Sequence, residues 1–259
     1  MNDYMHLKIV SVGEKADKAI KESLANGYEH IESVSIPPDK GYADEDTLEY
    51  LRGVDMAFIV SDDTTVALSR ATEAAKASRE MSVLTIGVLL TPVVLGLADW
   101  ERKKESAELA KFEEQVDAVF GVPQDKLQPL VKSIFGLTAT PGLINLDFTD
   151  MKYIFSKVGY ALVGLGMSSS ADMYADAAQA IMNDSVINNE IKRAGSLLIN
   201  IAGSENCLNM HGVNDTIVAI QELVHPDATI IFGATIDNTL SRNISVTVII
   251  TRLDELNDD

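Results

Sequence analysis

The chain has 259 residues, of which 46% are hydrophobic, and it carries a formal net charge of -18 at pH 7. This hydrophobic fraction is typical of a globular protein, and the length suits one compact body of two parts. A surface this acidic repels the phosphates of nucleic acids and of anionic lipids, so we expect no nucleic-acid partner and no direct membrane binding.

Cysteine usage and the N-terminal stretch indicate the compartment. Cys207 is the single cysteine, so no internal disulfide can form, and MNDYMHLKIV lacks the features of a secretory signal peptide. We therefore expect a cytoplasmic protein. The uncharged stretch at residues 81–98 contains Pro92 and falls short of the about 20 apolar residues that a spanning helix needs, so we interpret it as a buried strand and a loop.

The first half of the chain alternates short apolar runs with helical patterns. Strands are predicted at residues 6–13, 31–37, 54–60 and 82–90, and helices at residues 14–27, 44–53, 64–79 and 99–116. This alternation is typical of βαβ units, which form a parallel sheet covered by helices on both faces. Such sheets bind ligands beyond the carboxyl ends of their strands.

The second half has a different order of elements. A helix at residues 125–137 is followed by helices at 150–163, 169–182 and 214–225, and by strands at 196–202, 228–236 and 244–251. Strands and helices that do not alternate regularly predict a smaller α+β domain.

Two aspartates, Asp147 and Asp150, stand three residues apart in the stretch PGLINLDFTDMKYIF. Asp147, Thr149 or Asp150 is suited to cap the helix that follows, because a side-chain oxygen accepts hydrogen bonds from the first free N–H groups of a helix. Taken as residues alone, the pattern favours a structural role. Apolar residues at helical spacing predict a buried face on that helix: Met151, Ile154, Phe155, Val158 and Leu162.

The wider stretch PGLINLDFTDMKYIFSKVGYALVGLG closely resembles the synergy loop and following helix of FtsZ, the bacterial and archaeal relative of tubulin. The resemblance continues through ATIIFGATIDNTLSRNISVTVIITRL and covers residues 127–253. It implies a tubulin/FtsZ-like α/β fold. The expected parts are a parallel-sheet, Rossmann-like N-terminal domain in residues 1–124, a connecting helix in 125–140 and a smaller α+β C-terminal domain in 141–259.

In FtsZ, two carboxylates of this loop reach the nucleotide that the neighbouring subunit binds, and they help to activate water for GTP hydrolysis. The resemblance assigns these roles to Asp147 and Asp150 and places Asn145 at the loop asparagine. Anionic side chains suit this chemistry, because the attacking water must be oriented and must lose a proton. These three residues are the candidate catalytic residues.

The nucleotide-binding half departs from the FtsZ pattern. FtsZ has glycine-rich loops after two of its strands, whereas SVGEKADKA keeps only Gly13 and SDDTT keeps only Thr64 and Thr65. Glycine permits the turns in which backbone N–H groups cradle phosphates, and Asp62 and Asp63 repel a triphosphate unless magnesium intervenes. We therefore predict that both phosphate cradles are dismantled, with these five residues as the degenerate cofactor-binding positions.

Three functional hypotheses remain open. In the first, a diverged FtsZ-like cell-division-type protein binds no GTP in the family manner and acts by self-assembly or by capping the filament of an FtsZ-like partner. In the second, Thr64, Thr65 and a Mg²⁺ ion on Asp62 or Asp63 hold GTP or GDP, and the protein is a GTPase. In the third, the chain is a homo-oligomer whose loop only caps a helix. No dedicated metal site is expected under the first or the third hypothesis.

Three further segments carry weaker signals. The run from Pro92 to Trp100 is more apolar than the matching FtsZ segment, and we expect it to fill the vacated pocket, to form a contact patch or to pack as an ordinary helix-to-sheet contact. Cys207 and His211 stand four residues apart in SENCLNMHG, which reads as a loop and predicts no catalytic role. FtsZ has a C-terminal peptide that recruits membrane adaptors; this sequence stops before it, so we expect no coupling by that route.

Overall fold

The computed structural model describes residues 5–25, 31–37, 49–139 and 142–253, which form two compact units. The first unit comprises Met1–Gln128 with Phe155–Tyr160, and the second comprises Pro129–Ile154 with Ala161–Asp259. Gly27 and the first half of the helix expected at residues 44–53 lie outside the described residues.

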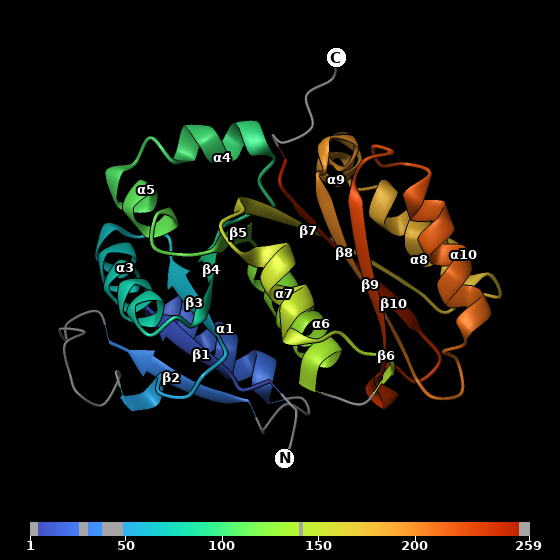
Figure 1. Ribbon diagram of the computed structural model, residues 1–259, viewed down its shortest axis with the longest axis horizontal. Coiled ribbons are helices and arrows are strands. Elements are labelled where there is room, and N and C mark those ends of the chain that lie inside the picture. The colour runs from blue at the N-terminus through green and yellow to red at the C-terminus, as the bar shows by residue number, and fades with distance from the viewer. Residues whose placement is uncertain (1–4, 26–30, 38–48, 140–141, 254–259) are drawn as a thin grey trace. The chain divides into compact units, whose positions relative to one another are not determined.

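The first unit is built on a parallel sheet, shown in blue to green in Figure 1. Within the described part of this unit the strand order is β2-β1-β3-β4-β5, and each neighbouring pair is parallel. Every residue of β3 is buried, as expected for a strand that is covered on both faces. The strands are β1 (Leu7–Val12), β2 (Glu32–Ile36), β3 (Met56–Asp62), β4 (Leu84–Leu90) and β5 (Ala118–Val122).

The helices of this unit confirm the predicted βαβ alternation, since α1 follows β1 and α3 follows β3. Figure 1 shows α3 and α5 lying beside each other along the sheet. The single helix predicted at residues 99–116 is wrong, because a turn at residues 104–106 divides it in two, and β5 was not predicted. The helices are α1 (Glu14–Leu24), α3 (Thr65–Glu80), α4 (Leu97–Lys103), α5 (Ala107–Glu113) and α6 (Gln124–Ala139), which continues into the second unit.

The second unit contains a mixed sheet in the order β7-β10-β8-β9-β6. Strand β10 is antiparallel to both of its neighbours, whereas β8 and β9 are parallel. Helices α8 and α10 pack against each other, as Figure 1 shows. The strands are β6 (Gly142–Ile144), β7 (Gly159–Ser168), β8 (Ser196–Gly203), β9 (Thr229–Ile236) and β10 (Ile244–Thr251). The helices are α7 (Phe148–Phe155), α8 (Met173–Met182), α9 (Ser185–Glu190) and α10 (Met210–Gln221). Two 3₁₀ helices are η1 (Ile191–Arg193) and η2 (Asn238–Leu240).

The helix predicted at residues 150–163 is wrong in its second half. Helix α7 ends at Phe155, and Leu162 lies in strand β7. Lys157 and Gly159 both have positive φ, at 55° and 67°, and this left-handed turn separates the helix from the strand. Gly164 and Gly166 lie in β7 where a Cβ would meet the side chain of Ile181 on α8, so these glycines allow α8 to approach the sheet closely.

Candidate functional site

Asp62 ends strand β3, and its carboxylate lies at the beginning of helix α1. One oxygen, Oδ1, accepts a hydrogen bond from the backbone N–H of Ala16 at 2.6 Å, and Oδ2 accepts one from the N–H of Lys15 at 3.2 Å. Asp62 is only 8% exposed. The first N–H groups of a helix lack partners within the helix and lie at its positive end, so a carboxylate is stabilised there.

Gly13 makes room for this carboxylate. Its φ of 102° and ψ of 160° lie in a region that is almost exclusive to glycine. A Cβ on Gly13 would lie 2.5 Å from the carboxylate carbon and from Oδ2 of Asp62. The sequence-predicted residues Gly13 and Asp62 are therefore in direct contact, and the backbone N–H groups at the start of α1 hold a side chain of the protein itself.

The rest of the loop after β3 is also engaged within the protein. Asp63 forms an ion pair with Lys103 at the end of α4. The hydroxyl of Thr64 accepts a hydrogen bond from the N–H of Ala67 at 3.2 Å, so Thr64 is the N-cap of α3. Thr65 is the first residue of α3 and is exposed. Asp62 and Asp63 thus have separate partners, and no metal-binding cluster of His, Cys, Asp or Glu occurs among the residues that the structure describes.

The two aspartates of the loop before α7 cap each other's backbone. Oδ1 of Asp147 accepts a hydrogen bond from the N–H of Asp150 at 2.9 Å, and Oδ2 of Asp150 accepts one from the N–H of Asp147 at 3.1 Å. This reciprocal pattern is a capping box, with aspartate where glutamate is usual. Asn145 stabilises the same loop, since its Oδ1 accepts a hydrogen bond from the N–H of Gly142 at 2.8 Å. The structure therefore gives all three candidate catalytic residues a local structural role.

We expect Asp147→Ala to lower the free energy of unfolding by about 1 kcal/mol, because it removes one of the two capping hydrogen bonds at the start of α7. Asp147→Asn keeps an acceptor and should cost less. Urea denaturation of the two variants measures the difference. Thr149→Ala is the matched control, since Thr149 is an exposed residue of the same turn, and an equal loss in this control would contradict the capping role of Asp147.

The apolar run from Pro92 to Trp100 divides into two parts. Leu97 and Trp100 are buried, and the ring of Trp100 stacks on Tyr160 with the ring centroids 4.3 Å apart. Ordinary packing within the first unit therefore accounts for this part. Val93, by contrast, is 59% exposed. Val93 follows strand β4, and Val66, which is 55% exposed, follows the neighbouring strand β3. An apolar side chain is therefore exposed after the carboxyl end of both β3 and β4.

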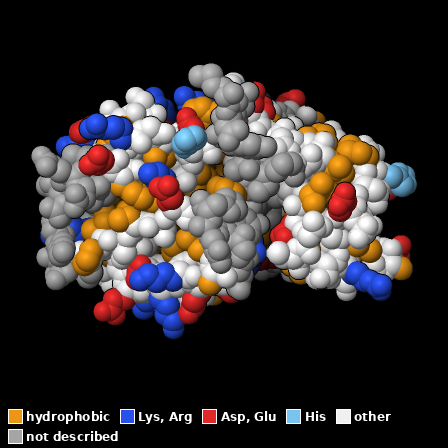
Figure 2. All heavy atoms as spheres, turned by 90° about the horizontal axis from the view of Figure 1, so that it is seen from below, with side chains coloured by type: hydrophobic (Ala, Val, Ile, Leu, Met, Phe, Trp, Pro, Cys, Tyr) orange, Lys and Arg blue, Asp and Glu red, His pale blue; other side chains and the backbone are white. Residues whose placement is uncertain are grey.

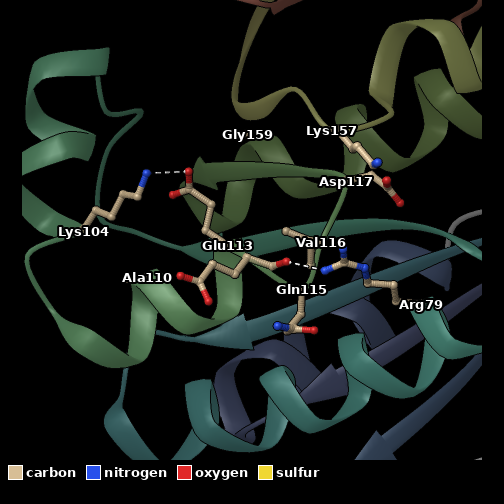
Figure 3. A pocket seen from close by; sticks show the side chains of 10 residues that line it. Arg79, Lys104, Ala110, Glu113, Gln115, Val116, Asp117, Lys157 and Gly159 are labelled. Atoms are coloured by element: carbon tan, nitrogen blue, oxygen red, sulfur yellow. Dashed lines mark hydrogen bonds and ion pairs between the residues drawn. The ribbon is translucent and has the colours of Figure 1, made fainter.

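A hollow of about 440 Å³ lies elsewhere in the first unit, near the amino ends of β4 and β5, and contains none of the predicted site residues. Figure 3 shows the ion pair of Lys104 with Glu113, at 2.9 Å, and the hydrogen bond of 2.8 Å from Arg79 to the carbonyl oxygen of Glu114. The hydrogen bond to Glu113 raises the pKa of the Lys104 ammonium group. Charged residues of both signs line this hollow, and Lys104 and Glu113 among them are paired with each other.

Cys207 and His211 line a hollow of about 510 Å³ in the second unit. His211 lies on α10 beside Asp215, with 3.5 Å between Nε2 and Oδ2, while Cys207 lies before that helix, with its Sγ 3.7 Å from the carbonyl oxygen of Ser241. Burial raises the pKa of Tyr174, whose hydroxyl donates to the carbonyl oxygen of Cys207. Both residues thus line the same hollow, but His211 contacts Asp215 and Cys207 contacts Ser241.

The face in Figure 2 carries side chains of both charges. Lys and Arg side chains stand among Asp and Glu side chains there, with no continuous basic surface. Within the described part of the chain, no helix has the length and apolar character needed to cross a membrane.

Comparison with known proteins finds similarity to FtsZ. Residues 159–254 match the profile of the FtsZ family, C-terminal domain. The chain is 29% identical over 227 residues to Cell division protein FtsZ 1 of Halobacterium salinarum, with 79% of this chain aligned. Residues 159–254 therefore resemble the C-terminal domain of FtsZ. The alignment covers 56% of that relative, so this chain spans little more than half of its length.

Solved structures share the fold of this chain. A structure described as an empty FtsZ dimer of M. jannaschii matches with a TM-score of 0.83 and 21% identity, covering 96% of this chain and 89% of that one. CetZ1 from Haloferax volcanii, described as a GDP-bound monomer, matches with a TM-score of 0.66 and 15% identity, covering 95% of this chain and 94% of that one. The fold is therefore that of the tubulin/FtsZ superfamily, as the sequence predicted.

Proposed function

We propose that this FtsZ-like protein acts in cell division or a related cytoskeletal process by assembling with copies of itself or with an FtsZ-like partner, and that it binds no GTP in the family manner. One observation carries the proposal: the loop after β3 uses its polar side chains within the protein. Asp62 engages the start of α1, Thr64 caps α3, and Asp63 pairs with Lys103. A nucleotide phosphate at the start of α1 has to displace a buried carboxylate.

Two of the similar proteins support the assembly part of the proposal. One is named as a cell division protein, and another is described as an FtsZ dimer that is empty. The exposed Val66, in the first turn of α3, and Val93 follow the carboxyl ends of β3 and β4, the side on which a parallel sheet normally meets its ligand. Exposed apolar side chains in that place favour contact with another protein over contact with a triphosphate.

Calorimetry of the purified protein with GTP and with GDP, each with and without Mg²⁺, tests the first part of the proposal. We expect no saturable heat up to millimolar nucleotide, because a triphosphate is repelled by the Asp62 carboxylate. An intact FtsZ, run under the same conditions, provides the positive control. Saturable binding that needs Mg²⁺ and is lost in the variant Asp63→Ala would instead support the GTPase hypothesis.

The partner hypothesis predicts an effect on an intact FtsZ. We expect the equimolar protein to change the GTP turnover of that FtsZ, measured as phosphate release, because the loop of Asp147 can meet a nucleotide on the partner. The change should disappear in Asp147→Ala and persist in Thr149→Ala. If the wild-type protein leaves turnover unchanged and does not co-sediment with FtsZ, the partner form of the proposal fails and self-assembly remains.

Val93→Glu tests whether the exposed apolar residues after β3 and β4 form a contact surface. A charge at this position should weaken self-association in sedimentation velocity, or co-sedimentation with FtsZ, because it introduces an unpaired carboxylate into an apolar contact. Val218→Glu is the matched control: Val218 is 46% exposed and lies on α10 of the second unit. Equal behaviour of the two variants would show that the strand ends are not a contact surface.

A further inference from the structure

We propose that the hollow between α8 and α10 is a docking site for an arginine or lysine side chain on a basic segment of a partner protein. The hollow has a volume of about 510 Å³, and all the residues that line it belong to the second unit. This inference goes beyond the proposed function, because it assigns a partner of opposite charge to residues outside the loops after β3 and before α7.

The layer formed by α8 and α10 has acidic charges and no lysine or arginine. All 21 Lys and Arg residues of the chain lie outside residues 158–191 and 194–241, the two stretches that contain these helices. Apart from two histidines, the charged residues there are acidic: Asp172, Asp176, Asp184, Glu190, Glu205, Asp215, Glu222, Asp227 and Asp237. A surface with one sign of charge attracts ligands of the opposite charge, so this layer favours a basic partner.

Two carboxylates of the hollow have no permanent positive charge beside them. Asp172 is exposed and forms no capping hydrogen bond with α8. The side chain of Asp215 is 56% exposed and lies 3.5 Å from Nε2 of His211, which is charged only when it is protonated. Among the described residues that line the hollow there is no Lys or Arg. An incoming guanidinium or ammonium group therefore supplies the missing charge and donates hydrogen bonds to the carboxylates.

The inner wall suits the apolar stem of such a side chain. Ala175 on α8 and Ala219 on α10 are short, and the half-buried Met173 adds an apolar surface between them and Asp172. Lys and Arg side chains bury their apolar stems and keep the charged group in water. An apolar wall with exposed carboxylates matches this division of the side chain into stem and charged end.

Tyr174 holds this wall in place before a partner binds. Its ring packs on α10, where a Cβ on Gly212 would lie 2.2 Å from a ring carbon. Its hydroxyl donates to the carbonyl oxygen of Cys207 at 2.9 Å and accepts from the N–H of Asn209 at 2.9 Å. A wall that is already ordered costs little conformational entropy on binding.

The same charges decide between possible occupants. Nucleic acids and anionic lipids are repelled by an acidic layer. A second copy of this chain in a symmetric contact would place the same acidic layer opposite, and like charges across an interface weaken it. A basic segment of a different protein has the charge that this layer lacks.

A synthetic peptide tests the proposal. The probe is a fluorescein-labelled peptide of alternating arginine and alanine with the length of α10, 12 residues. Its control has citrulline, which is neutral and has nearly the same shape, at every arginine. Fluorescence polarisation in about 0.15 M salt measures both affinities, since distant exposed charges are screened there. We expect the citrulline peptide to bind at least about tenfold more weakly, and equal affinities overturn the proposal.

Two double variants locate the contact. Asp172→Asn combined with Asp215→Asn should weaken binding of the arginine peptide about five- to tenfold, because two exposed ion pairs are lost. Glu80→Gln combined with Glu105→Gln removes the same two charges from exposed positions of the first unit and should weaken binding less than about twofold. If the two double variants bind the peptide alike, net charge alone holds it and the proposal fails.

Ala175→Leu tests the hollow without changing any charge. The larger side chain should occupy part of the hollow and weaken binding of the arginine peptide at least about threefold. Ala107→Leu, at an exposed position of α5, is the control and should bind as the wild type does. Circular dichroism checks that both variants are folded. Unchanged affinity in a folded Ala175→Leu protein overturns the proposal, and the charge variants keep it testable if this protein does not fold.

Two other outcomes would give the hollow a different occupant and overturn the proposal. If free arginine amide displaces the peptide at the same concentration of arginine groups, the ligand is a small cation. If the wild type self-associates in sedimentation velocity and the Asp172→Asn, Asp215→Asn variant does not, the occupant is a second copy of this chain. Peptide binding that is weakened by the variants of the hollow and not by their controls supports a basic partner segment.

Discussion

Trp100→Ala is expected to lower the free energy of unfolding by about 3–5 kcal/mol, which makes it the most damaging substitution that we predict in the first unit. Trp100 is fully buried, and its ring stacks on Tyr160 at an interplanar angle of 9°. Its Nε1–H donates to Oε2 of Glu113 at 2.9 Å, and its ring lies 3.2 Å from the ideal Cβ position of Gly121 on β5. Alanine leaves a large cavity and removes one hydrogen-bond donor from the Glu113 carboxylate.

Trp100→Phe separates packing from hydrogen bonding. Phenylalanine keeps a ring against Tyr160 but cannot donate to Glu113, so we expect a smaller loss, about 1–3 kcal/mol. Trp100 is the single tryptophan of the sequence, so urea unfolding has to be followed by circular dichroism. Val93→Ala, at an exposed position of the same run, should leave stability nearly unchanged. If Trp100→Ala costs no more than this control, Trp100 is not part of the core.

The sequence predicts the two-part fold well but misses short or unusual elements. The alternation in residues 6–90 follows from apolar runs that are each followed by a helical pattern, and the structure confirms it for α1 after β1 and α3 after β3. Strand β5 is missed because its five residues follow directly on a charged helical pattern. Strand β7 is missed because Met151, Ile154, Phe155, Val158 and Leu162 happen to be spaced as in one long helix, although the positive φ of Lys157 ends that helix early.

The candidate site shows what a linear pattern leaves out. Mutual capping by Asp147 and Asp150 can be foreseen, since both residues lie within one turn of the same helix. The partner of Asp62 cannot be foreseen from local spacing, because the N–H groups that it binds lie 46 and 47 residues earlier in the chain. The sequence did contain one indication of this contact. Strands β1 and β3 are parallel neighbours, so the residues at their carboxyl ends, Gly13 and Asp62, must lie close together.

Gly13→Ala should lower the free energy of unfolding by about 3 kcal/mol, the largest effect that we expect within the site. Two costs combine. An alanine at φ 102° and ψ 160° is strained by about 1–3 kcal/mol, and its Cβ, 2.5 Å from the carboxylate, pushes Asp62 away from Lys15 and Ala16. Chemical denaturation measures the total, and a second glycine separates the two costs.

Gly53→Ala is that control. Gly53 also has a positive φ, 72°, but nothing lies within 4 Å of its ideal Cβ position, so only strain should appear, about 1 kcal/mol. A double-mutant cycle of Gly13→Ala with Asp62→Gly isolates the contact itself. We expect the double variant to lose at least about 1 kcal/mol less than the sum of the two single losses, because the second substitution removes the group with which the new Cβ collides. Additive losses would mean that Gly13 is required by its backbone conformation alone and that the Asp62 carboxylate does not depend on the missing side chain.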